Sequence, residues 1–405
     1  MKKRLTIFLL LISIFTFSQQ IVKGKIISEN NTLLEGASVF FNNTTVGTIS
    51  DSKGEFQLKI PKGNYTLVIS FLGYQTYQQT LNTHDSIPFL TIPLKEDIAL
   101  LDEVTVSKIV YDDEWKYNLN RFKKAFLGRS KLAESCKIMN EKDIHFDFDS
   151  KTNSLTATTR KPLIIKHNGL GYKIIYDLED FTLDQNKLYY SGYARYENLR
   201  KSVRKKWQKN RLEAFNGSKM HFLRSLLSEN LKEDGFLVHQ FKRVPNPERP
   251  SEEKIQHAQQ LIKLHGNSVN FTKKIDTPIT PLDSALVTLR KARLPKYRDY
   301  LYKSNLDSYS AMISRTENIP FLDFKDYLMV VYTKETEEEN YLTGTFGKKR
   351  KPTGVQTSNL VLLHGKSKID PAGILIDPTA TFNEGYWAFE SFANLLPLDY
   401  NPKNQ

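Results

Sequence analysis

Short strand-like segments separated by turns fill the first hundred residues that follow an N-terminal apolar run. In residues 55–60 the apolar side chains alternate, so that Phe56, Leu58 and Ile60 share one face. The preceding turn, 51–54, ends in a glycine that suits a positive φ. Similar segments recur roughly every eight to twelve residues, a spacing typical of a β-sandwich. The other predicted strands are 21–28, 37–44, 47–50, 65–71, 75–81, 87–94 and 104–106.

A series of short motifs runs through these segments. It comprises Gly24, Leu34-Glu35-Gly36-Ala37-Ser38-Val39, Gly47-Thr48, Asp51-Ser52-Lys53-Gly54-Glu55-Phe56, Tyr65-Thr66-Leu67 and Phe71-Leu72-Gly73-Tyr74. The series resembles the carboxypeptidase-regulatory-like domain, which implies an all-β, seven-stranded transthyretin-like (prealbumin-like) sandwich over residues 19–106. The closing segment, 101–106, is similar to the one that follows this module in TonB-dependent outer-membrane receptors. Fewer than 300 residues follow Val106, so we do not expect the rest of such a receptor.

The N-terminus has the features of an export signal. A positive stretch, residues 2–4, precedes an apolar run over 5–17, and Thr16 and Ser18 supply small residues at the −3 and −1 positions of a cleavage site. We therefore predict a signal peptide over 1–18 and a mature protein in the periplasm, or peripheral to the outer membrane, of a Gram-negative envelope. The apolar run is shorter than the roughly 20 residues that span a bilayer, and no later stretch predicts a transmembrane helix. The lone Cys136 excludes an internal disulfide.

The second part of the chain is predicted to be an α+β domain rich in antiparallel sheet. A linking helix is expected over 107–128, because Asp112 can cap it and its apolar residues recur at helical spacing until Gly128. The α+β domain then covers 129–405, with a proline-rich internal linker at 245–250. Predicted strands are 144–148, 155–159, 163–166, 172–178, 188–193, 327–333, 359–364 and 374–377, and predicted helices run from Ser218 to Gly235 and from Ser251 to Gly266.

The chain is strongly basic, with 58 Lys and Arg residues against 45 Asp and Glu. One basic stretch is the strongest candidate for an anionic-ligand patch, and its members are Lys201, Arg204, Lys205, Lys206, Trp207, Lys209 and Arg211. Such a patch can bind anionic lipid headgroups or an acidic polysaccharide. The alternative is a solvated helix face whose tryptophan packs inward. Nucleic acid fits the charge but not an exported location.

The sequence contains no recognisable catalytic motif. None of the eight histidines has a glutamate three residues later, so the zinc-ligand pattern of a carboxypeptidase is absent. No Gly-x-Ser-x-Gly elbow occurs, and Cys136 is interpreted as a structural thiol. A glycosidase would need paired carboxylates; the candidates, with two neighbouring aromatic residues, are Asp370, Asp377, Glu384, Tyr386 and Trp387. We predict no cofactor and no metal.

Two functional hypotheses follow from these observations. The first is a non-enzymatic binding or scaffold protein of the envelope, whose partner is a protein, a glycan or an anionic lipid. The second is an envelope hydrolase that acts on peptides or glycans, with its site in the C-terminal domain. Convergence of acids or histidines in one pocket would distinguish the second from the first.

Overall fold

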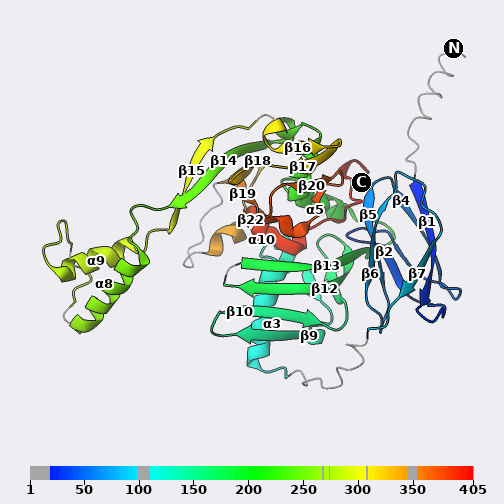
Figure 1. The fold of residues 1–405 in the computed structure, drawn as a ribbon, viewed down its shortest axis with the longest axis horizontal. Helices are drawn as coiled ribbons and strands as arrows, with labels where there is room; N and C mark the ends of the chain where they lie inside the picture. The colour runs from blue at the N-terminus through cyan, green and yellow to red at the C-terminus, as the bar shows by residue number, and fades with distance from the viewer. Residues whose placement is uncertain are drawn as a thin grey trace, which may run out of the picture.

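The computed structural model describes residues 19–97, 110–185, 187–266, 269–272, 274–306, 309–344 and 354–404. The predicted signal peptide, 1–18, and the predicted strand 104–106 lie outside the described residues. Figure 1 shows three parts: an N-terminal sandwich, a body built on several sheets, and a helical arm that extends from the body.

The N-terminal sandwich consists of two sheets that enclose one apolar core. One sheet has the strand order β4-β1-β7 and the other β3-β2-β5-β6. The strands are β1 Gln19–Ser28, β2 Ser38–Phe41, β3 Gly47–Ile49, β4 Glu55–Pro61, β5 Asn64–Ser70, β6 Tyr77–Asn82 and β7 Leu90–Leu94. The alternation predicted for β4 is confirmed, since Phe56, Leu58 and Ile60 are buried and the residues between them are exposed.

The first part of the body is a six-stranded antiparallel sheet, called the central sheet below. Its order is β8-β11-β12-β10-β9, and β13 pairs with β12. The strands are β8 Cys136–Ile138, β9 Ile144–Asp149, β10 Ser154–Thr159, β11 Leu163–His167, β12 Tyr172–Asp184 and β13 Lys187–Asn198. Helix α3 (Asp113–Phe126) covers one face, with the Phe122 ring centroid 4.6 Å from that of Phe181. Asp112 caps this helix as predicted, by accepting the N–H of Trp115 at 2.8 Å.

A second, five-stranded sheet forms the rest of the body with a smaller four-stranded one. The larger sheet has the order β15-β14-β18-β19-β22, and the smaller one β16-β17-β20-β21. The strands are β14 Phe236–Pro245, β15 Tyr297–Lys303, β16 Ile313–Thr316, β17 Ile319–Leu322, β18 Tyr327–Thr336, β19 Val355–Leu362, β20 Ser367–Asp370, β21 Ile374–Leu375 and β22 Thr381–Gly385. The body is thus mostly antiparallel sheet with helices on its faces, in agreement with the predicted sheet-rich second part.

The helices of the body other than α3 are short. They are α4 Lys131–Glu134, α5 Lys205–Phe215, α6 Lys219–Leu227, α7 Leu231–Asp234 and α10 Tyr386–Glu390. Ser218 caps α6 as predicted, because its side chain accepts the N–H of His221. The single helix predicted from Ser218 to Gly235 is nevertheless divided, since Glu229 takes a φ of 60° and the chain re-enters a helical turn only at α7.

The arm is a hairpin of helices α8 (Glu252–His265) and α9 (Pro281–Lys291), carried by the paired strands β14 and β15. Residues 245–250, predicted as a linker, join β14 to α8. Asn246 is buried within this connection, and its N–H donates to the carbonyl of Lys296 at 2.9 Å.

Residues 386–400, which we call the C-terminal segment, contact both the body and the sandwich. Phe392 packs in the core of the central sheet, and the Ala393 N–H donates to the Leu127 carbonyl. Toward the sandwich, the Leu398 N–H donates to the Asn43 carbonyl, and Asp399 accepts hydrogen bonds from the N–H and the hydroxyl of Thr45. The C-terminal segment therefore links the sandwich to the body.

We predict that Asp399→Ala weakens the attachment of the sandwich. The substitution leaves the Thr45 N–H without its carboxylate acceptor, which we expect to lower the free energy of unfolding by about 1–2 kcal/mol. The measurement is the urea midpoint of the first unfolding transition, together with the rate of protease cleavage around residues 42–46. The matched control is Asp377→Ala, because Asp377 is an exposed aspartate whose carboxylate accepts hydrogen bonds from neighbouring residues such as Thr379. Equal effects of the two substitutions would contradict the prediction.

Candidate functional site

Helix α5 contains most of the predicted basic patch, and it is fixed to the turn between β11 and β12. Trp207 donates from its indole Nε1 to the Asn168 carbonyl at 2.9 Å. Arg211 donates from Nε to the Leu170 carbonyl at 2.8 Å, and Asn210 donates to the Gly169 carbonyl at 2.7 Å. Three successive carbonyls of one turn thus receive three donors from one helix, which fixes the position of the helix on the sheet.

A glycine in this turn makes the close approach feasible. Gly171 has a φ of 73°, and a Cβ at this position would overlap the indole of Trp207. Only glycine combines this backbone conformation with the absence of a side chain. The sequence fragment Gly169-Leu170-Gly171 therefore serves packing between helix and turn.

Two members of the predicted patch belong to the interior. Trp207 and Arg211 are buried, at 6% exposure each. The Arg211 guanidinium lies 3.8 Å from the centroid of the Tyr172 ring and also donates to the Asn198 side chain at 2.9 Å. Burial lowers the pKa of Arg211 from its usual value, but its carbonyl and ring partners stabilise the charged form. Neither side chain is available to a ligand.

The other five members are exposed, and we call them the helix cations: Lys201, Arg204, Lys205, Lys206 and Lys209. The guanidinium of Arg204 lies 5.2 Å from the Trp207 ring centroid, and Lys209 lies 3.7 Å from Glu213. Arg204 precedes the first turn of α5, and its side chain makes no capping hydrogen bond. The first turn of α5 lies wholly within the described residues and contains no acidic residue. Cations at the positive end of a helix repel its dipole, so a nearby anion is favourable there.

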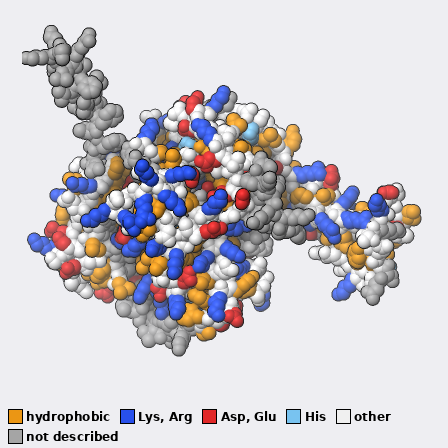
Figure 2. All heavy atoms as spheres, turned by 180° about the vertical axis from the view of Figure 1, so that it is seen from behind, with side chains coloured by type: hydrophobic (Ala, Val, Ile, Leu, Met, Phe, Trp, Pro, Cys, Tyr) orange, Lys and Arg blue, Asp and Glu red, His pale blue; other side chains and the backbone are white. Residues whose placement is uncertain are grey.

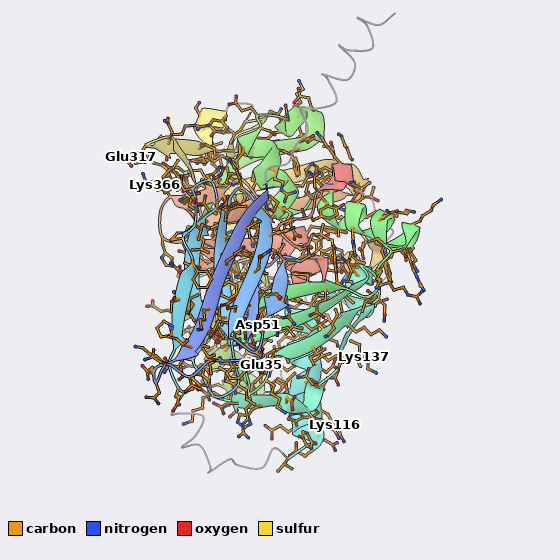
Figure 3. The ribbon with its side chains drawn as sticks, turned by 90° about the vertical axis from the view of Figure 1, so that its right-hand side faces the viewer. Glu35, Asp51, Lys116, Lys137, Glu317 and Lys366 are labelled. Carbon is orange, nitrogen blue, oxygen red and sulfur yellow. The ribbon has the colours of Figure 1, made fainter. Side chains whose placement is uncertain are left out.

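A row of lysines crosses the outer face of the central sheet beside α5. Lys166 on β11 lies directly opposite Lys137 on β8 and directly opposite Lys173 on β12. Directly opposed residues of neighbouring antiparallel strands point to the same face, and like charges there are destabilising. We call Lys137, Lys166 and Lys173 the lysine row; Lys137 and Lys166 are exposed, and Figure 3 shows Lys137 at the margin of this sheet.

A carboxylate at the end of the row neutralises part of its charge. Glu197 on β13 lies opposite Lys173 and pairs with it at 3.1 Å. The same carboxylate also pairs with Arg195 at 2.8 Å. One negative charge therefore serves two cations, and the lysine row keeps a net positive charge. On the face drawn in Figure 2, Lys and Arg side chains are widespread over the body and Asp and Glu are fewer.

The row ends at a cleft between the sandwich and the central sheet. Arg195, Tyr196 and Glu197 form one wall. The other wall comes from the sandwich and consists of Thr45, Gly47, Thr48 and Ile49. The cleft encloses about 210 Å³. Arg195 is fixed in it by a 2.7 Å hydrogen bond to the Ser38 hydroxyl.

The lysine row was missed by sequence reasoning. Each lysine alternates with core residues in its own strand. This alternation predicts from the sequence alone that each lysine faces outward. The alignment of the three lysines depends on strand register and on a sheet order in which β11 lies between β8 and β12. Neither can be read from local spacing.

Ser135 and His167 lie close together, but their hydrogen bonds are those of a structural contact and not of a catalytic pair. The Ser135 hydroxyl lies 3.2 Å from Nδ1 of His167, yet it donates to the Leu132 carbonyl at 2.6 Å. The His167 Nδ1 accepts the N–H of Leu170, so its proton is on Nε2, 2.8 Å from the Ala393 carbonyl. Burial lowers the pKa of His167 to about 4. The ring is held neutral between the central sheet and the C-terminal segment.

The carboxylates considered for a glycosidase have separate local partners. Glu384 is paired with Arg243 at 2.8 Å, which holds the pKa of Glu384 below its usual value. Asp377 caps a short turn through Thr379. Asp370 is buried and accepts the Ala372 N–H. The two aromatic residues beside them, Tyr386 and Trp387, are buried in the body.

Cys136 is partly buried, and its sulfur lies 3.6 Å from the Leu132 carbonyl. Burial raises the pKa of its thiol to about 12, which keeps it protonated and unreactive. Within the described ranges, no cluster of three or more His, Cys, Asp or Glu side chains is placed to hold a metal ion. No helix in the described part of the chain has the length and apolar character that crossing a membrane requires.

Comparison with known proteins identifies the first part. Residues 22–106 match the family model of the CarboxypepD_reg-like domain. The N-terminal sandwich is a CarboxypepD_reg-like domain. The resemblance predicted from its motifs is thereby confirmed.

Relatives of the CarboxypepD_reg-like domain include parts of much longer proteins. TonB-dependent receptor SusC of Bacteroides thetaiotaomicron is 38% identical over 96 residues, covering 24% of this chain and 9% of the receptor. TonB-dependent receptor P39 of Formosa agariphila is 32% identical over 104 residues, covering 25% of this chain and 10% of the receptor. The chain spans about a tenth of the length of these relatives.

A solved type II cohesin–X-dockerin complex from Acetivibrio cellulolyticus is similar over 27% of this chain and 76% of its own. Its sequence identity is 21% and its TM-score 0.19, which is too low to show a common fold.

We predict that protonation of His167 makes the fold acid-sensitive. The pKa of His167 is lowered in the folded state, so the unfolded chain binds the proton more tightly between about pH 6.5 and 4. Stability from this group is therefore present above pH 6.5 and lost as the pH falls toward 4, by up to about 3 kcal/mol. His167→Gln should be less stable at pH 7 and show a shallower fall in this window, measured by urea unfolding at several pH values. His145→Gln, at an exposed position on β9, is the control and should keep the wild-type profile. Identical profiles for His167→Gln and the wild type would disprove the assignment.

Proposed function

We propose that this protein is a non-enzymatic binding protein of the Gram-negative envelope that holds a multivalent anionic ligand on the lysine row. The observation that carries the proposal is the direct opposition of Lys166 to a lysine on each neighbouring strand. Neighbouring strands lie about 5 Å apart. A ligand with several closely spaced phosphate or carboxylate groups can therefore contact all three ammonium groups.

The surroundings of the row support the same ligand class. The helix cations lie on α5 and just before its start, and α5 is hydrogen-bonded to the turn joining the strands of Lys166 and Lys173. At the opposite end, the row leads to the cleft lined by the CarboxypepD_reg-like domain. A polyanion lying along the row thus meets residues of both parts of the chain, which gives the sandwich a role in binding.

The cellular setting is part of the proposal. The sequence features of residues 1–18 favour export, and the relatives of the sandwich are receptors of the TonB-dependent class. We place the mature protein in the periplasm or at the periphery of the outer membrane. We also retain the transthyretin-like assignment of the sandwich and the predicted domain bounds of 19–106, 107–128 and 129–405 as part of this proposal.

The hydrolase alternative has no specific observation in its favour. The carboxylates Asp370, Asp377 and Glu384 each have separate local partners, and the Ser135 hydroxyl donates to a backbone carbonyl. We therefore do not propose it as a second function.

We predict that Lys137→Gln, Lys166→Gln and Lys173→Gln together abolish most polyanion binding. Each lysine near an anionic surface contributes about 1 kcal/mol, so the triple variant should bind roughly a hundredfold more weakly. The probes are soluble polygalacturonate and vesicles containing phosphatidylglycerol, used separately to distinguish a glycan from a lipid source. Titrations at two ionic strengths should show that salt weakens wild-type binding, because screening acts on exposed charges.

The matched control removes three exposed lysines from the sandwich: Lys23→Gln, Lys59→Gln and Lys62→Gln. The control variant changes the net charge by the same amount as the lysine-row variant. If the loss of affinity depends on where the lysines lie, the control variant binds the probes about as tightly as the wild type. If the control and the lysine-row variant lose the same affinity, or if the wild type binds neither probe, the proposed site is wrong.

A further inference from the structure

The arm extends away from the body, and its far end has no contact with the sandwich (Figure 1). Its base is fixed by polar contacts between the start of α8 and the end of α9. Arg249 pairs with Glu252 at 2.7 Å and donates to the Ala292 carbonyl at 3.3 Å. Lys296 pairs with the same Glu252 at 3.2 Å. The hairpin is therefore held at its base, where it leaves strands β14 and β15.

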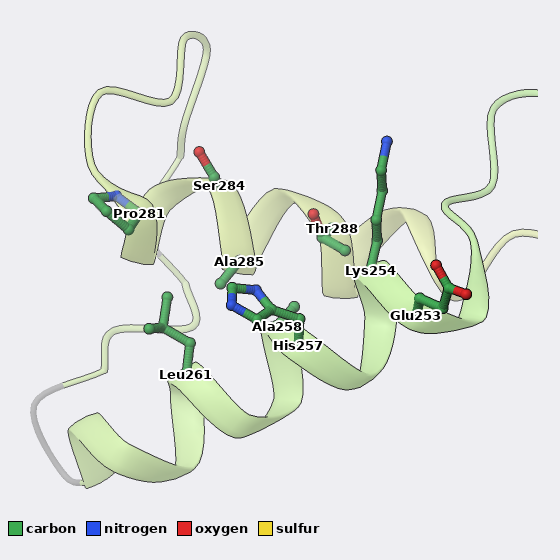
Figure 4. A pocket seen from close by; sticks show the side chains of 9 residues that line it. All are labelled: Glu253, Lys254, His257, Ala258, Leu261, Pro281, Ser284, Ala285 and Thr288. Carbon is green, nitrogen blue, oxygen red and sulfur yellow. The ribbon is translucent and has the colours of Figure 1, made fainter.

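The two helices pack on each other through small and medium-sized side chains. Ile255 and Ala258 of α8 and Ala285 and Leu286 of α9 are buried. Figure 4 shows the groove that remains between the helices on one side, with His257 and Ala285 directed toward each other. Both helices carry side-chain caps, and α9 has a complete capping box at Thr280. The internal stability of the hairpin thus comes from its middle and its base.

Large apolar side chains are exposed at the end of α8, just before α9, and in the connection between the two helices. Leu264 lies in the last turn of α8 and is 81% exposed, and Ile279 lies just before α9 and is 88% exposed. Phe271, in the connection between the helices, is 61% exposed. Its carbonyl accepts a hydrogen bond from Arg290 at 3.2 Å, which ties the connection to α9. We call Leu264, Phe271 and Ile279 the tip residues.

Basic side chains accompany the tip residues. Lys263 precedes Leu264, and Lys274 follows Phe271 by three residues; both are exposed. Residues 246–296 contain nine Lys and Arg against five Asp and Glu. Bulky apolar residues with flanking lysines suit the boundary between lipid headgroups and acyl chains, where the apolar part is buried and the ammonium groups meet anionic lipid. A projecting end of this kind also fits a soft bilayer surface better than a concave pocket.

We propose that the end of the arm inserts the tip residues into the surface of an anionic bilayer. The arm then attaches the protein peripherally to a membrane, while the lysine row on the body stays available for its own ligand. The proposal uses other residues than the lysine row and goes beyond the anion-binding function.

The test is co-flotation of the mature chain with vesicles. The wild type is compared on vesicles of phosphatidylcholine alone and of phosphatidylcholine with phosphatidylglycerol, and should bind the anionic vesicles more strongly. The tip variant combines Leu264→Gln, Phe271→Gln and Ile279→Gln. We expect it to partition onto anionic vesicles at least about tenfold more weakly, because three side chains no longer enter the apolar boundary. Its binding to soluble polygalacturonate should equal that of the wild type.

A control variant removes three exposed residues of the same types from the sandwich. It combines Leu72→Gln, Phe89→Gln and Ile21→Gln, whose side chains are 81%, 55% and 42% exposed. The proposal predicts vesicle binding at the wild-type level. It is overturned if the control loses as much binding as the tip variant, or if the tip variant floats like the wild type.

A second measurement does not depend on losing function. In Phe271→Trp, the added tryptophan should shift its emission to shorter wavelength on anionic vesicles, relative to the wild type with its three tryptophans. An unchanged emission overturns insertion. The proposal is also overturned if the wild type self-associates with rising concentration in lipid-free buffer and the tip variant does not. The tip residues would then form a contact between protein molecules. Failure of these tests leaves polygalacturonate binding by the lysine row unaffected, so the two proposals fail separately.

Discussion

A half-buried arginine that donates to three backbone carbonyls holds the parts of this protein together. Arg224 on α6 donates from Nε to the Ala372 carbonyl, and from its two terminal nitrogens to the carbonyls of Tyr400 and Leu398, all at 2.9–3.1 Å. Burial lowers the pKa of Arg224, but a guanidinium stays charged in proteins, so these acceptors compensate for the water that the charge loses. Hydrogen bonds to charged groups contribute about 1.5–3 kcal/mol each when they are buried. The end of the chain is thereby fixed on the body.

The position of the sandwich follows from this fixed end. Leu398 and Asp399, next to the acceptors of Arg224, make the hydrogen bonds to residues 43 and 45 of the sandwich. The same sandwich loop pairs with β13, where the Tyr196 N–H donates to the Thr44 carbonyl. The cleft beside Arg195 and Glu197 therefore has a defined width, because both of its walls are held by backbone hydrogen bonds. A ligand bound there would not need to order the two parts first, and this preorganisation favours affinity.

Local patterns in the sequence predicted individual elements well and their arrangement poorly. Alternation in β4 and β9, and the caps at Asp112 and Ser218, depend on neighbouring residues and were readable. The basic stretch was recognised, but the burial of Trp207 depends on a glycine 36 residues earlier in the sequence, Gly171. The lysine row required the pairing order of distant strands. The excess of Lys and Arg favoured anionic partners, but it did not show which of the 58 cationic side chains lie close together on the surface.

The separation of the two proposed surfaces has a physical reason. Lysines held on a rigid sheet keep a fixed spacing, which suits recognition of a ligand with its own spacing of charges, and they are weakened by salt. Apolar residues on a projecting hairpin need no fixed spacing, since burial from water is non-directional. An arm carried by the β14–β15 strands can therefore meet a soft surface without disturbing the cleft, because its base is held by Arg249 and Lys296 at a distance from the C-terminal segment. Attachment through the arm also limits the ligand search of the lysine row to one surface, which raises the effective concentration of any anionic ligand displayed there.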